Sequence, residues 1–157
     1  MNKINKKSII KNIALLLVVA IFFSLDRYLK YLAIHIFSSQ SFNLLGSFLK
    51  FSLAKNYYIA FSLPLYGWVL NILISLIIIG LISYIFYLIS AKNNQRLIIF
   101  SLTLILFGAI SNLTDRLIFG YVIDYFDFKY FTVFNLADVM ISLGVIMFLF
   151  KYKQQTK

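Results

Sequence analysis

The chain has 157 residues, of which 62% are hydrophobic and 13% are charged. A soluble domain is closer to half apolar and a quarter charged, so this composition excludes an ordinary soluble domain and favours a membrane protein. The formal net charge of +10 is compatible with nucleic-acid binding, but the basic residues lie at the ends of apolar runs, which is typical of membrane orientation instead.

Four apolar stretches approach the roughly 20 residues that a helix needs to cross a bilayer. We expect these transmembrane helices at about 9–25, 68–89, 97–113 and 134–150. The first stretch has the basic start and apolar core of a cleaved signal peptide, but no small-x-small cleavage site follows it. The sequence therefore predicts one integral-membrane domain over residues 1–157.

The distribution of basic residues predicts the orientation. Nine of the 15 lie before or at the start of the first stretch, between the second and third, or after the fourth: Lys3, Lys6, Lys7, Lys11, Lys92, Arg96, Lys151, Lys153 and Lys157. With four spans these three segments lie on one side, which the positive-inside rule assigns to the cytoplasm. We therefore expect both termini to be cytoplasmic.

The acidic residues are segregated from those segments. All five lie in the two other connecting segments or at the adjoining helix ends: Asp26, Asp115, Asp124, Asp127 and Asp138. Acids contribute little to topology, so this segregation predicts a functional site on the outer face. Residues 47–53, 121–126 and 128–134 mix aromatic and polar residues as strands do. The predicted fold class is membrane all-α, with four transmembrane helices and a small extracytoplasmic β-sheet.

Two carboxyls are the strongest candidates for catalytic residues. Asp138 opens the fourth helix, where the helix dipole alone would favour an acid. Asp124 lies in an apolar, aromatic run, where a carboxyl needs a partner or a raised pKa. Two close carboxyls share a proton, so one acts as base on a water and the other as acid, as in aspartic proteases. Spacing alone leaves open whether Asp124 or Asp115 is the partner of Asp138.

Other polar residues near the helix ends favour structural roles. Asp26 and Lys30 are four residues apart, as in a helical ion pair. Asn112 is three residues from Asp115 and four from Arg116, so a helix would place it on a face with both. We expect Asp115 to be structural and held by these two residues. The sequence has no Cys, one His (His35) and no Gly-x-Ser-x-Gly elbow, so we expect no metal, no cofactor and no covalent acyl-enzyme.

Five blocks of the sequence occur in the order of one known family. They read Asp-Arg-Tyr-Leu-Lys at 26–30, Lys-Asn-Tyr-Tyr-Ile-Ala-Phe-Ser at 55–62, Gly-Ala-Ile-Ser-Asn-Leu-Thr-Asp-Arg at 108–116, Val-Ile-Asp-Tyr at 122–125 and Phe-Asn-Leu-Ala-Asp at 134–138. Together they resemble the bacterial lipoprotein signal peptidase (signal peptidase II) family. Any one block is weak, but five in order on a chain of this size is a specific signal.

The resemblance implies an aspartic endopeptidase of the bacterial cytoplasmic (inner) membrane. It would cleave the signal peptide of prolipoproteins before a diacylglyceryl-modified Cys, with lipid-modified prolipoproteins and membrane lipids as partners and without nucleic acid. The family's catalytic aspartates correspond to Asp124 and Asp138. Its supporting polar residues correspond to Asp26, Lys30, Asn56, Asn112, Asp115, Arg116 and Asn135.

The chain also departs from the family pattern. Tyr58 and Ile59 stand where the family has Gly-Ala, and we expect them to narrow the channel that receives the substrate. Arg27 replaces the usual Gln, and Ser111 replaces the usual Gly. The family usually has a short lid helix before its second transmembrane helix, and residues 63–67 leave little room for it here. The stretch from Asp124 to Asp138 is also short for the family.

Two alternatives remain at this point. One is a diverged relative that binds lipoproteins without cutting them or cuts a narrower set. The other is a small transporter, which would need polar residues at mid-depth in its helices. Acids confined to the outer edge favour a peptidase over a conduction path.

Overall fold

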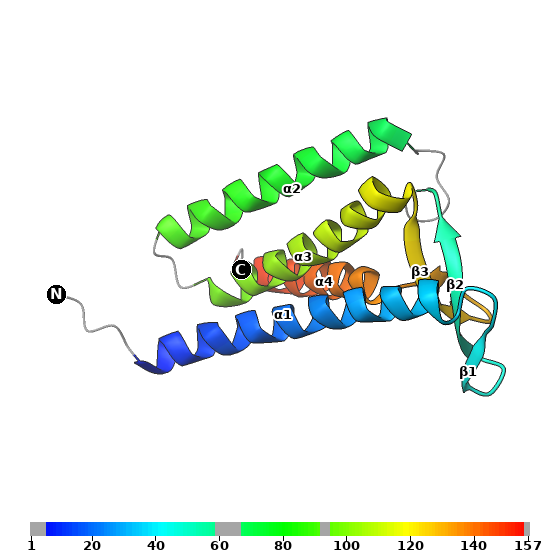
Figure 1. Ribbon diagram of the computed structural model, residues 1–157. Helices are drawn as coiled ribbons and strands as arrows, with labels where there is room; N and C mark the ends of the chain where they lie inside the picture. The colour runs from blue at the N-terminus through cyan, green and yellow to red at the C-terminus, as the bar shows by residue number, and fades with distance from the viewer. Residues whose placement is uncertain (1–5, 59–66, 92–94, 156–157) are drawn as a thin grey trace.

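The computed structural model describes residues 6–58, 67–91 and 95–155. Four helices run along one another, and a small sheet crosses one end of them (Figure 1). The helices are α1 (Lys6–His35), α2 (Gly67–Ser90), α3 (Arg96–Phe119) and α4 (Leu136–Gln155). The first residues of α1 and the last of α4 lie at the end opposite the sheet (Figure 1).

All four helices are longer than the apolar pattern predicts, and α1 and α3 extend furthest. α1 was expected to end at 25 but continues to His35. It continues because Asp26 and Lys30, which interrupt the apolar run, are buried and paired inside the protein and do not need to leave the helix for water. α3 was expected to end at 113 but continues to Phe119 and stops at Gly120, whose φ of 80° suits a glycine C-cap. α4 was expected at 134–150 but begins at Leu136, because Phe134 pairs in the sheet and Asn135 caps the helix, and it continues to Gln155.

The membrane character of the fold comes from the helix surfaces. Within the described ranges, three helices are long and apolar enough to cross a membrane: α1, α2 and α3. Their outward faces carry exposed aliphatic side chains such as Leu16, Leu76 and Ile79. α4 does not meet the same criterion, and its charged residues lie towards its two ends. The chain has a mostly helical membrane fold with a small antiparallel sheet.

The sheet contains four strands in the order β1-β2-β3-β4. They are β1 (Phe42–Leu45), β2 (Leu49–Asn56), β3 (Val122–Phe128) and β4 (Val133–Phe134). The two longest correspond to the strand-like patterns at 47–53 and 121–126. The third pattern, 128–134, is mostly a turn, and only its end pairs with β3. β1 was not predicted, because its residues are all exposed and carry no alternation to read.

Close packing of α3 against α4 sets the geometry of the site. A Cβ added to Gly108 would lie 2.6 Å from the carbonyl oxygen of Ala137. A Cβ added to Gly144 would lie 2.6 Å from the carbonyl oxygen of Ser101. One glycine on each helix therefore allows the backbones to approach, as small residues do at helix interfaces in membranes. This approach places the first turn of α4 beside the last turns of α3.

Candidate active site

The first turn of α4 is held in place by side chains from three other elements or segments. Asn135 is its N-cap: its Oδ1 accepts from the Asp138 N–H (2.9 Å), and the Asp138 carboxylate accepts from the Asn135 N–H (3.2 Å). This reciprocal pair is a capping box. The N–H of Leu136 donates to the Tyr125 hydroxyl (2.9 Å), and that of Ala137 donates to Asp26 (3.1 Å).

The Asp138 carboxylate has a donor on each oxygen. Its Oδ2 accepts from the backbone of Asn135, and its Oδ1 accepts from Nδ2 of Asn112 on α3 (2.8 Å). Its position in the first helical turn also places it in the favourable end of the α4 dipole. The orientation of this carboxyl is therefore fixed from both sides.

The Asp124 carboxylate is held in a similar way by two amides. Asp124 lies on β3 opposite Ala54 of β2, and it is 2% exposed. Its Oδ1 accepts from Nδ2 of Asn135 (2.6 Å), and its Oδ2 accepts from Nδ2 of Asn56 at the end of β2 (3.0 Å). Asn135 thus hydrogen-bonds to both Asp124 and Asp138. The structure therefore brings Asp124, not Asp115, to the residue that caps Asp138.

The environment of Asp124 favours its protonated form. Burial, and then the nearby carboxylate of Asp138, raise the pKa of Asp124 from 3.8 to about 7. Hydrogen bonds from Asn56 and Asn135 and the charge of Lys30 act in the opposite direction. A carboxyl with a pKa near neutrality can give or take a proton at physiological pH, which is the requirement for general acid–base catalysis.

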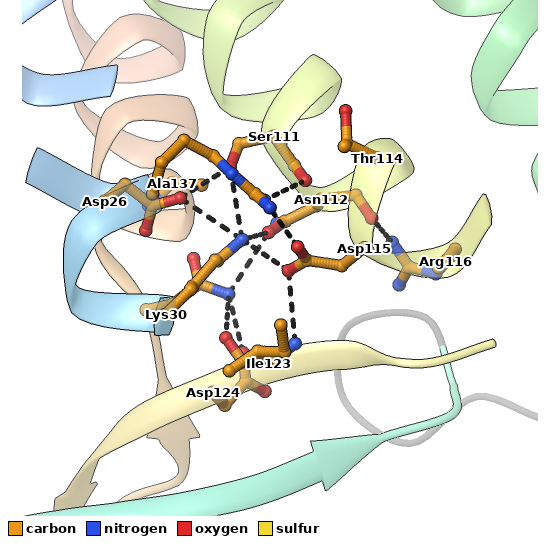
Figure 2. A network of polar contacts seen from close by, with 12 residues as sticks. Asp26, Lys30, Ser111, Asn112, Thr114, Asp115, Arg116, Ile123, Asp124 and Ala137 are labelled. Atoms are coloured by element: carbon orange, nitrogen blue, oxygen red, sulfur yellow. Dashed lines mark hydrogen bonds and ion pairs between the residues drawn. The ribbon is translucent and has the colours of Figure 1, made fainter. Parts of the chain in front are cut away.

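A cluster of ion pairs lies near Asp124, between α1 and α3 (Figure 2). Lys30, which is 1% exposed, contacts Asp115 (2.7 Å) and Asp26 (3.2 Å), and both acids are fully buried. The Lys30 ammonium also donates to Oδ1 of Asn112 (2.9 Å). The predicted helical pair of Asp26 and Lys30 is confirmed. Asn112 connects this cluster to Asp138.

Asp26 also ties the sheet and α4 to α1. Its Oδ1 accepts from the Tyr125 hydroxyl (2.9 Å) as well as from the Ala137 N–H. Burial, followed by the charge of Asp26, raises the pKa of Tyr125, so the phenol remains a neutral donor. The Ser111 hydroxyl donates to the other oxygen of Asp26. Asp26 is therefore a structural anchor at the junction of α1, α3, β3 and α4.

The expected partners of Asp115 are wrong. Within the described residues its carboxylate pairs with Arg27 and Lys30 of α1 and accepts from the Ile123 N–H (3.2 Å), so it is held from α1 and β3 and not from its own helix. Arg116 instead donates to the Tyr58 carbonyl (3.0 Å) and to the carbonyl of Asn112 (3.5 Å), the neighbour that the helical spacing predicted. The helical spacing was correct, but charged partners on α1 compete better than neighbours on the same helix.

All nine candidate residues lie in one connected polar network. The sequence missed three members: Arg27, Ser111 and Tyr125. One feature of the sequence could have indicated Arg27: it is a charged residue next to Asp26 at the edge of a membrane span. Nothing in a single sequence indicates that the Tyr125 hydroxyl reaches α1. Of the two large residues at the departure from the family, Tyr58 is half-exposed, and Ile59 and residues 63–66 lie outside the described residues.

A mostly helical membrane fold with a small sheet, in which one asparagine hydrogen-bonds to the buried Asp124 and the partly buried Asp138, fits the class of membrane aspartic peptidases. Comparison with known proteins agrees with this class. The family model described as "Signal peptidase (SPase) II" matches residues 18–153. The chain therefore belongs to the signal peptidase II family.

Individual relatives support this assignment. The lipoprotein signal peptidase of Caldicellulosiruptor bescii is 38% identical over 82% of this chain and 83% of its own length. That of Thermodesulfovibrio yellowstonii is 36% identical over 81% and 86%. A solved bacterial membrane enzyme superposes with a TM-score of 0.77 over 92% of this chain and 90% of its own, at 24% identity, and shows the shared fold.

Proposed function

We propose that this protein is a lipoprotein signal peptidase in which Asp124 and Asp138 form the catalytic pair. The assignment of this pair rests on Asn135, whose side chain accepts from the Asp138 N–H and donates to the Asp124 carboxylate. Family membership and the names of the relatives support the substrate class, which is the prolipoprotein with a diacylglyceryl-modified Cys.

The chemistry follows from a pair that shares one proton. The ionised carboxylate takes a proton from water, and the resulting hydroxide attacks the carbonyl carbon of the bond before the modified Cys. The protonated carboxyl donates to the carbonyl oxygen, and a proton then passes to the leaving amine nitrogen. Asn56, Asn112 and Asn135 fix the carboxyl orientations, so that little reorganisation is needed during the reaction.

The membrane supplies part of the substrate positioning. In this proposal all four helices span the bacterial inner membrane, both termini are cytoplasmic, and the sheet and the two carboxyls lie at the outer face. The acyl chains of a modified Cys remain in the bilayer and hold the scissile bond at the depth of the first turn of α4. Such anchoring provides proximity without extensive recognition of side chains.

Cleavage of purified prolipoprotein tests the function. The wild-type protein in detergent or lipid should convert a diacylglyceryl-modified prolipoprotein to the shorter form on a gel, and a Cys→Ser version of the substrate, which cannot be modified, should stay intact. A protein that binds the modified substrate without cutting it would indicate the non-cleaving relative. Cleavage of both substrates at equal rates would contradict dependence on the lipid.

Labelling tests the orientation. Cysteine is introduced at Gln95, at the start of α3, and separately at Asp127 on β3. A membrane-impermeant thiol reagent added to intact cells should label position 127 and not position 95. Labelling of position 95 from outside would overturn the orientation. The chain has no native Cys, so these variants report single sites.

A further inference from the structure

Arg27 and Ser111 have no assigned role, yet they contact each other at the centre of the ion-pair cluster. Nη1 of Arg27 lies 3.3 Å from the Ser111 carbonyl oxygen and 3.4 Å from its hydroxyl, and it pairs with Asp115. The Ser111 hydroxyl also accepts from Lys30 (3.2 Å) and donates to Asp26. Both residues depart from the usual family pattern, and the structure joins them.

The charges in this cluster balance only when Arg27 is included. Asp26 and Asp115 are fully buried, and two cations, Lys30 and Arg27, face them. Each oxygen of Asp115 takes one cation: Oδ1 pairs with Arg27 and Oδ2 with Lys30. Without Arg27, Lys30 would be the one cation paired with both buried carboxylates within the described residues, and Asp115 would draw its ammonium away from Asn112.

The position of the Lys30 ammonium determines which way the Asn112 amide points. Oδ1 of Asn112 accepts from Lys30 (2.9 Å) and from Nδ2 of Asn135 (3.1 Å), which leaves Nδ2 of Asn112 to donate to Asp138 (2.8 Å). The reversed amide would place Nδ2 against an ammonium and Oδ1 against a carboxylate, and both contacts are repulsive. Lys30 therefore fixes the donor that orients Asp138.

We propose that Arg27, together with the Ser111 hydroxyl, is a positioning residue for the reaction. By holding one oxygen of Asp115, Arg27 keeps the Lys30 ammonium on Asn112, and Asn112 keeps its donor on Asp138. Arg27 acts through these residues and touches neither the water nor the substrate. The inference rests on the proposed function, because it assigns a role in the same reaction.

Kinetics of Arg27→Gln and Arg27→Lys test this role. Arg27→Gln should lower kcat about 10- to 100-fold, with KM changed less than about twofold, because misoriented catalytic groups cost this much while the substrate site is intact. Arg27→Lys retains a cation and should recover most of the rate. Arg96→Gln, at the far end of α3, is the matched control and should leave kcat unchanged. A kcat for Arg27→Gln equal to that of the wild type would overturn the proposal.

The pH profile separates positioning from a purely structural role. The charged groups around the two carboxyls are Lys30 and Asp26 on α1 and Arg116 on α3. If Lys30 moves away in Arg27→Gln, the acidic limb of the rate profile should shift to higher pH, because ionisation of the pair loses a cation and a donor. A variant that is less stable but has the wild-type profile per folded molecule would overturn the proposal.

A double-variant cycle with Ser111→Ala tests whether the two residues act through the same ammonium. The double variant should lose little more rate than the worse single variant, since both changes release Lys30. Losses that multiply would overturn the joint assignment. Failure of the proposed function is recognised separately, because then the wild-type protein itself would not cleave the modified substrate.

Discussion

The carboxyls of the polar network occupy two kinds of environment. Asp26 and Asp115 lie against the cations of α1, whereas Asp124 and Asp138 are held mainly by neutral amide and backbone donors. An ion-paired carboxylate stays charged and cannot easily take part in proton transfer. A carboxyl held by amides beside a second carboxyl keeps a proton within reach of neutral pH. The comparison indicates that acids of one polar network differ in their electrostatic environment because their partners differ.

The largest effect is expected from the amide-held pair. Asp124→Asn or Asp138→Asn should lower the cleavage rate about 10³-fold or more, because each change removes a general acid or base. Both variants should still fold, since Asn has the same shape as Asp and its single oxygen can keep one of the two hydrogen bonds. Gel-based cleavage with circular dichroism measures both properties. Asp127→Asn, on the same strand but outside the network, is the control. Full activity of Asp138→Asn would mean that the amide-held carboxyls are not the catalytic pair.

The opposite outcome is expected for the ion-paired acids. Asp115→Asn leaves Lys30 and Arg27 short of a counter-charge, and breaking a buried pair costs about 3–5 kcal/mol. Protein yield and melting temperature should fall, and activity should fall in parallel with the folded fraction. A well-folded, inactive Asp115→Asn combined with an active Asp124→Asn would mean that the catalytic pair is assigned to the wrong residues.

The pH dependence of stability distinguishes the two environments. The pKa of Asp124 is raised in the folded state, so its contribution favours folding at low pH and is lost as pH rises from about 4 to about 7. Between pH 5 and pH 8 the wild type should therefore lose about 3 kcal/mol of stability relative to Asp124→Asn. Thermal melts of both proteins across this range measure the difference. Parallel curves would show that Asp124 is ionised throughout.

The close contact of α3 and α4 supports the amide-held pair and can be disturbed directly. Gly108→Ala places a methyl group against the Ala137 carbonyl and the Ile141 side chain and should cost about 1–3 kcal/mol. It should also lower kcat, because Asp138 follows Ala137 and would move away from Asn112. Gly80→Ala on α2 is the control, since its added Cβ meets nothing within 4 Å. Equal behaviour of the two variants would show that the helices adjust without cost.

The smallest effect concerns substrate range. Tyr58 is two residues from Asn56, which donates a hydrogen bond to Asp124. The carbonyl of Tyr58 accepts a hydrogen bond from Arg116. We expect Tyr58→Gly combined with Ile59→Ala to broaden the set of prolipoproteins cleaved by severalfold, as measured with substrates that differ around the modified Cys. An unchanged range would mean that these side chains point away from the substrate. Tyr130→Ala, on the exposed turn before β4, is the control.

The mostly helical membrane fold with a small sheet and the candidate site residues could be predicted from the sequence, because they depend on local patterns. Long apolar runs predicted the helices, alternation predicted β2 and β3, and the five ordered blocks indicated all nine candidate residues. The end of α1 was missed because burial of Asp26 and Lys30 allows the helix to continue. The pattern at 128–134 was mistaken for a strand because a turn can carry the same residues.

The sequence by itself determined which residues are polar, where they stand on the helices and the family to which they point. Apart from the helical pair of Asp26 and Lys30, only the tertiary structure decided their partners. It paired Asp115 with Arg27 and Lys30 instead of Arg116, and it placed Asn135 between Asp124 and Asp138. The reason is that a buried charge or amide is satisfied by whichever group the packing brings within about 3 Å, and groups far apart in sequence compete on equal terms once the helices and the sheet have assembled.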